Sequence, residues 1–106
     1  MKFLVPAILI ALPCAAETWT NAALVDVACS SKVKADPDVH TRDCAIKCEK
    51  TGYALVTSDG AVLKLDEKGN REAIAALKAS TKADHLHATV VGDRDGDIIK
   101  VKSLKM

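Results

Sequence analysis

The stretch YALVTSDGAVLKLDE, from Tyr53 to Glu67, decides the fold. Residues 53–57 (YALVT) and 61–65 (AVLKL) are short apolar runs that contain β-branched side chains, which is typical of β-strands. Residues 58–60 (SDG) between them are of the types that favour tight turns. The stretch therefore predicts a β-hairpin.

The chain downstream of this hairpin continues with a helix and then a second hairpin. Residues 68–80 (KGNREAIAALKAS) place Ile74 and Leu77 on one helical face, and Asn70 is the expected N-cap. Residues 85–104 (HLHATVVGDRDGDIIKVKSL) alternate apolar and polar side chains on both sides of Asp95-Gly96, a two-residue turn signal. This part of the chain predicts a short helix followed by two strands.

The chain upstream of the central hairpin contains a strand and a helix. Residues 19–28 (WTNAALVDVA) begin with an aromatic residue and hold β-branched ones, which indicates a first strand. After a polar loop, Asp36 and Pro37 suit the N-cap and the first position of a helix that runs to about Lys50. Thr41 is an alternative N-cap one turn later. Gly52 lies where a left-handed residue ends such a helix.

The order of these elements predicts the fold class. Without the first helix, the order is β-β-β-α-β-β, which is that of a five-stranded OB-type barrel. We therefore predict a mainly β fold, an OB-like barrel with a helix inserted after strand one and a short helix between strands three and four. An open α+β sheet fits the same order less well. No internal repeat or linker divides residues 17–106, so we expect a single domain.

The first 16 residues, MKFLVPAILIALPCAA, have the pattern of a signal peptide. Lys2 precedes an apolar run, and small residues follow it, so we expect cleavage after about Ala16. The run is too short for a transmembrane anchor, and no later segment resembles one. Cys14 follows Leu12 and Pro13 where a lipoprotein signal needs a small residue, so lipidation is not expected. The sequence predicts a periplasmic or secreted bacterial protein.

Charge and motifs narrow the classes of function. Of the 15 basic side chains only Lys2 lies in the expected signal peptide, so 14 basic and 14 acidic residues remain in the domain. A neutral domain is a poor ligand for nucleic acid or for anionic lipid. No paired carboxylates, nucleophile elbow or phosphate-binding loop stands out. We therefore expect binding rather than catalysis, with a protein or small-ligand partner in the periplasm.

Cysteines form the most prominent chemical cluster. After signal cleavage Cys29, Cys44 and Cys48 remain, and on a continuous helix His40 would share one stripe with the last two. Disulfides are the default in an oxidising compartment. Cβ atoms one helical turn apart are about 5–6 Å from each other, whereas a disulfide needs about 3.8 Å. We therefore expect Cys29 to pair with Cys44 or Cys48, with one thiol left over.

Two other interpretations of the cluster stay open. Cys29, His40, Cys44 and Cys48 together offer three sulfurs and one imidazole, a ligand set that suits zinc or copper as Cu(I). The spacing H-x3-C-x3-C is not a common zinc signature. Alternatively, Cys44 or Cys48 attacks a partner's disulfide in a thiol-redox accessory protein, although no C-x-x-C motif is present.

Two further pairs of residues are weaker candidates for ligand binding. Trp19 and Tyr53 are a possible stacking platform for a base or a sugar, but without a basic groove packing is the expected role. His85 and His87 share one face of the expected strand and could hold copper or nickel. A polar outer face of the barrel is the expected interpretation of this second pair.

Three segments, WTNAALVDVAC, RDCAIKCEKTGYALVTSDGAVLKLD and VVGDRDGDIIKVKSL, together resemble a family of small exported bacterial domains of unknown function. That family shows W-T-G followed by D-x-x-C, then C-x3-C with a glycine and Y-x-L-V, and a closing V-x-V-x-G hairpin. Asn21 and Ser30 stand where the family usually has glycine. The resemblance implies an OB-like exported domain and no particular activity. The residues that carry it are Trp19, Asp26, Cys29, Cys44, Cys48, Gly52, Tyr53 and Gly92.

Overall fold

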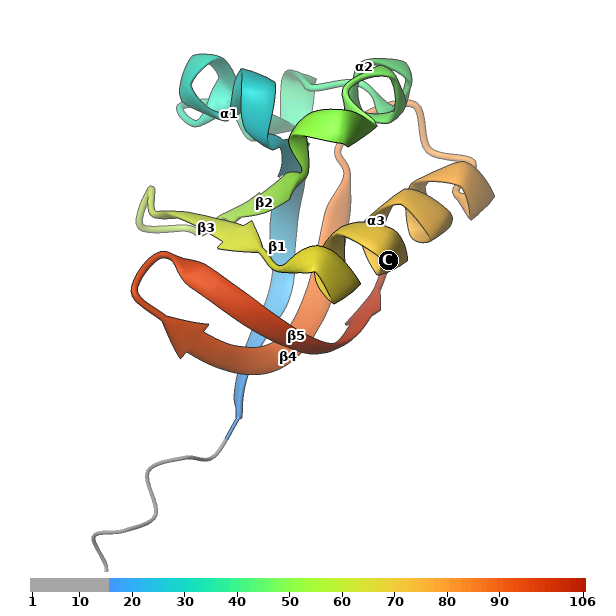
Figure 1. The fold of residues 1–106 in the computed structure, drawn as a ribbon. Coiled ribbons are helices and arrows are strands. Elements are labelled where there is room, and N and C mark those ends of the chain that lie inside the picture. The colour runs from blue at the N-terminus through green and yellow to red at the C-terminus, as the bar shows by residue number, and fades with distance from the viewer. Residues whose placement is uncertain (1–15) are drawn as a thin grey trace, which may run out of the picture.

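A computed structural model describes residues 16–106 as a closed five-stranded β-barrel with helices at its surface (Figure 1). The strands close in the order β1-β2-β3-β5-β4, and β4 pairs with β1. This is the OB-like barrel that the sequence predicts. Residues 1–15 of the expected signal peptide, with Cys14 among them, lie outside the described residues. The strands are β1 (Glu17–Asp26), β2 (Tyr53–Val56), β3 (Val62–Leu65), β4 (His87–Asp95) and β5 (Ile98–Lys105).

The barrel closes through one short parallel seam. β1 is antiparallel to both β2 and β4, and β3 meets β5 in parallel register for only two residue pairs. At this seam the Lys64 N–H donates to the Asp97 carbonyl at 2.7 Å, and the Asp66 N–H donates to the Ile99 carbonyl at 3.0 Å. These bonds satisfy backbone groups that would otherwise form an open sheet edge.

Alternation along the strands fills the barrel with aliphatic side chains. Leu24 of β1, Leu55 of β2 and Ile99 of β5 are at most 1% exposed and belong to one core cluster. The helix α3 (Glu67–Ala79) adds Ala73 and Leu77 to this cluster, so it covers one opening of the barrel. Figure 1 shows α3 between β3 and β4 in the chain, where the sequence predicts a helix.

α3 begins at Glu67, one residue before the predicted region, and its N-cap lies four residues before the predicted one. Asp66 is the N-cap, and its Oδ1 accepts the Gly69 N–H at 2.9 Å. The prediction of Asn70 as N-cap is therefore wrong. Asp66 directly follows β3, so the helix begins as soon as the strand ends. The Asn70 side chain instead accepts the Tyr53 N–H at 2.8 Å and joins α3 to β2.

The segment between β1 and β2 is not the single helix predicted from Asp36 to Lys50. Pro37 starts only a short 3-10 turn, and His40 then adopts extended backbone with φ −70° and ψ 132°. Thr41 caps the next helix by accepting the Cys44 N–H at 3.2 Å, which confirms the alternative start. The segment consists of α1 (Val27–Val33), η2 (Pro37–Val39), α2 (Arg42–Lys47) and η3 (Glu49–Thr51).

The helix α1 occupies residues for which the sequence predicts strand and loop. Val27 and Val33 pack on a second apolar cluster formed by the outward-facing side chains of β1 and β2. All four residues of β2 are consequently buried, because the barrel interior covers one face of the strand and this cluster covers the other. In Figure 1, α1 and α2 lie together at one end of the barrel.

The turn between β4 and β5 differs from its prediction by one residue. Asp95 pairs with Ile98, so the two-residue loop is Gly96-Asp97 rather than Asp95-Gly96. Gly96 has φ +66°, which suits a glycine at the first central position of such a turn. Within residues 16–106, none of the helices combines the length and the apolar character that crossing a bilayer requires.

Candidate functional site

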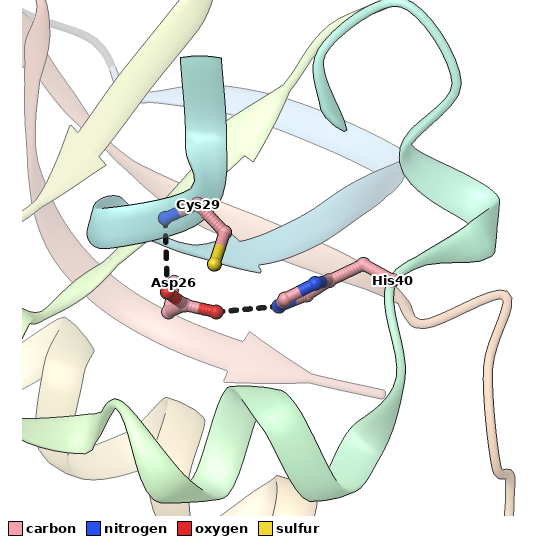
Figure 2. A group of neighbouring side chains, drawn as sticks. All are labelled: Asp26, Cys29 and His40. Atoms are coloured by element: carbon pink, nitrogen blue, oxygen red, sulfur yellow. Dashed lines mark hydrogen bonds and ion pairs between the residues drawn. The ribbon is translucent and has the colours of Figure 1, made fainter. Parts of the chain in front are cut away.

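Three side chains with different donor atoms converge at the end of the barrel that α1 and α2 cover. They are Asp26, Cys29 and His40, and one ligand atom from each lies within 4.8 Å of the other two. Figure 2 shows the Cys29 sulfur turned toward the Asp26 carboxylate and the His40 ring. We call these three residues the DCH cluster.

Asp26 is the centre of the DCH cluster because it joins a strand to a helix. It is the last residue of β1 and the N-cap of α1, and its Oδ2 accepts the Cys29 N–H at 3.1 Å. An N-cap carboxylate faces the first helical turn, which is where Cys29 lies. The sequence D-x-x-C thus places the thiol beside the carboxylate.

His40 bonds to the other oxygen of the Asp26 carboxylate. Its Nε2 lies 2.5 Å from Asp26 Oδ1, and the two side chains are 5% and 0% exposed. A buried carboxylate is costly unless it has hydrogen-bond partners. The extended backbone at His40, between η2 and α2, brings the ring to the carboxylate. On the predicted continuous helix, the His40 side chain would instead have pointed to the same side as those of Cys44 and Cys48.

The environment of Cys29 favours the protonated thiol. Burial raises the pKa of the Cys29 thiol above its ordinary value, and the Asp26 carboxylate and the charge of Cys48 raise it further. Lys32 acts weakly in the opposite direction. A raised pKa keeps the thiolate fraction low at neutral pH, which is unfavourable for a nucleophilic cysteine.

The structure separates the four predicted metal ligands. Cys29 and His40 come together, whereas Cys44 is exposed and Cys48 is half-buried, and neither belongs to the DCH cluster. Cys29, Cys44 and Cys48 are free thiols in the structure, so the predicted disulfide stays a prediction. Asp26 is the member of the DCH cluster that reasoning about metals missed. Only the D-x-x-C element of the family resemblance pointed to it.

The two aromatic residues considered as a possible platform lie in different environments. Tyr53 is 1% exposed, and its hydroxyl donates to the Ala45 carbonyl at 2.7 Å, so its ring belongs to the core. Trp19 is half-buried and lines an open cleft of about 730 Å³ beside β1. Other residues that line this cleft are Asn21, Lys34, Asp38, Thr57 and His87.

His85 and His87 also differ from their prediction. His85 precedes β4, is exposed, and has φ +53°, so it does not continue the alternation of the strand. The His87 ring bonds to Asp38 Oδ1 at 2.6 Å and to the Asn21 carbonyl at 2.9 Å. These bonds occupy both ring nitrogens of His87 and connect η2 to β4.

Comparison with protein-family models, with curated proteins and with solved structures finds no match for this chain. The fold and the cluster nevertheless define a class, a small OB-like barrel with a carboxylate, a thiol and an imidazole gathered at one end. The family resemblance of the sequence stays a prediction.

Proposed function

We propose that this protein is a small exported binding domain and that its ligand is a transition metal ion, zinc or copper, held by the DCH cluster. The convergence of Asp26, Cys29 and His40 within 4.8 Å is the observation that carries this proposal. The signal-peptide pattern of residues 1–16 supports export. Binding through the cluster needs no catalytic residue.

The spacing of the donor atoms is close to that of a tetrahedral site. A zinc ion at about 2.0–2.3 Å from its ligands holds the ligand atoms roughly 3.3–3.7 Å apart. The present atoms lie within 4.8 Å of one another, and the His40–Asp26 contact is 2.5 Å. A displacement of roughly 1 Å at each ligand is therefore enough to admit the ion.

The chemistry of the donors indicates which ions suit the cluster. One sulfur, one imidazole nitrogen and one carboxylate oxygen form a mixed set that zinc accepts, and the sulfur and nitrogen also suit copper. Calcium and magnesium need mainly oxygen ligands, of which the DCH cluster offers those of one carboxylate. We therefore expect selection of zinc or copper over calcium and magnesium.

Titration of the reduced, metal-free protein with Zn²⁺ tests the proposal. We expect one ion per chain, and Co²⁺ should give the spectrum of a tetrahedral site with a thiolate ligand. Cys29→Ser should abolish the thiolate band and weaken binding, whereas Cys44→Ser, at an exposed thiol outside the cluster, should leave both unchanged. Circular dichroism checks that each variant is folded.

A wild-type protein that takes up no metal would overturn the proposal, and so would equal binding by Cys29→Ser. In that case the Asp26–His40 pair would be a structural link between β1 and the segment before α2.

A further inference from the structure

We propose that Cys29 and Cys48 form a redox pair that controls the metal site: as thiols they allow metal binding, and as a disulfide they release the ion. This inference rests on the proposed function, because it describes the regulation of the same site. It also chooses between the two disulfides that the sequence leaves open for Cys29.

Backbone contacts place Cys48 beside the start of α1. The Val27 N–H donates to the Gly52 carbonyl at 2.8 Å, and the Ala28 N–H donates to Thr51 Oγ1 at 3.3 Å. The Thr51 hydroxyl in turn donates to the Cys48 carbonyl at 2.9 Å. Two hydrogen bonds thus connect the residue before Cys29 to Cys48.

Burial favours the same pair. Cys29 and Cys48 are both half-buried, whereas Cys44 is exposed. Because the hydrogen bonds of Thr51 hold η3 against the start of α1, Cys48 is the cysteine whose side chain can turn toward Cys29.

Cys44 does not fit this role. It lies in the first turn of α2 with an exposed side chain, and its N–H is held by Thr41 Oγ1. Cys48 is the C-cap of that helix, one helical turn after Cys44. Cβ atoms at this spacing are about 5–6 Å apart, which is too far for a disulfide between the two residues. The pair Cys29–Cys48 is thus favoured over both alternatives, and Cys44 is the remaining thiol.

The chemistry of the switch is balanced by an added oxidant. In the zinc-loaded protein the Cys29 sulfur would be a metal-bound thiolate without a proton, whereas the Cys48 thiol loses one proton. The pair loses two electrons, and the S–S bond forms as the metal–sulfur bond breaks and the ion leaves. An azo oxidant such as diamide takes up the two electrons, the Cys48 proton and a second proton from water as its N=N bond becomes N–N. In an exported protein, a disulfide-bonded oxidant can accept them by thiol–disulfide exchange. Reduction reverses the step.

Oxidation of the zinc-loaded protein by diamide tests the inference, with zinc release followed by a chromogenic chelator and with disulfides assigned by peptide mass mapping. We expect loss of about 2 Da, a Cys29–Cys48 bridge, and release of the ion. Cys44→Ser should behave like wild type. Cys48→Ser should release zinc at least about tenfold more slowly. The reason is that this variant lacks the neighbouring thiol, whose effective concentration is on the order of millimolar.

The outcomes distinguish this inference from the proposed function. One-to-one zinc binding together with a bridge through Cys44, or with no bridge, would overturn the redox pair and leave the metal site standing. A Cys29–Cys48 bridge in a protein that binds no zinc would overturn both the metal site and its control. Cys48→Ser that still binds zinc but no longer releases it on oxidation would support the switch.

Discussion

Asp26 shows how one side chain can connect three parts of the molecule. Its carboxylate ends β1, caps α1 through the Cys29 N–H, and meets the His40 ring at 2.5 Å. Removing the carboxylate would therefore disturb a helix cap and a buried pair together, so its variants cannot separate metal binding from folding. Cys29 is a better probe, since it contributes the third donor without holding the backbone by its side chain.

We expect metal affinity to rise with pH because the metal displaces a thiol proton. Burial raises the pKa of Cys29, so the thiol is protonated near neutral pH. If binding displaces one thiol proton, the affinity for the metal should rise about tenfold per pH unit. A slope near one between roughly pH 7 and 8.5 would mean that binding displaces one thiol proton. Competitive zinc titration across this range measures the slope. A pH-independent affinity would contradict a thiolate ligand.

Tyr53→Phe should destabilise the fold. The hydroxyl donates to the carbonyl of Ala45, in the last turn of α2, where carbonyls lack helical partners. Burial raises the pKa of Tyr53 to about 12, so the hydroxyl stays a donor. Leaving the Ala45 carbonyl unpaired should cost about 1–2 kcal/mol of unfolding free energy. Urea denaturation followed by Trp19 fluorescence measures it, and an unchanged midpoint would show that this bond contributes nothing.

At the scale of elements, the strands of the barrel were easier to predict than the segment between β1 and β2. Alternation and turn residues located all five strands, since these signals are local. The break in the predicted helix, in contrast, depends on a contact with a residue distant in the sequence. Pro37 begins a 3-10 turn, and Asp38 within that turn is held by His87, a residue of β4 far along the chain. Such a contact overrides helix propensity and cannot be read from the segment itself.

Gly92→Ala should disrupt the pairing of β4 with β5. The register shifts between Val91 and Gly92, and a Cβ at Gly92 would lie 2.4 Å from the Lys100 carbonyl oxygen. Because that obstacle is backbone, the strands must separate, and we expect a loss of about 3 kcal/mol. Gly60→Ala is the control, because Gly60 has φ +87° but open space around it, and should cost about 1 kcal/mol. Equal effects in chemical denaturation would contradict this account.

At the scale of the whole molecule, the barrel brings together residues that the sequence keeps apart. The sequence pointed to Cys29 and His40 as part of a metal set, but only the fold adds Asp26 and removes Cys44. Residue spacing assumed a continuous helix, whereas the extended backbone at His40 turns its ring toward the end of β1. The donors therefore belong to β1, α1 and the segment before α2, which are held in place by the rest of the barrel.

Metal binding should consequently stabilise the whole barrel. An ion held by ligands from three segments binds the folded chain far better than the unfolded chain, so zinc at 100 times its Kd should add about 2.7 kcal/mol. For a domain of this size that corresponds to a rise in Tm of roughly 10–20 °C. Differential scanning calorimetry with Zn²⁺, with excess chelator, and with Mg²⁺ measures the shift.

The matched variants show where the stabilisation originates. Cys44→Ser should keep the zinc-dependent rise, because its thiol lies outside the DCH cluster, whereas Cys29→Ser should lose most of it while unfolding near the metal-free wild-type temperature. A rise of equal size in Cys29→Ser would place the ion elsewhere on the surface. A rise with Mg²⁺ as large as with Zn²⁺ would mean that oxygen ligands alone suffice, which the single carboxylate of the DCH cluster cannot provide.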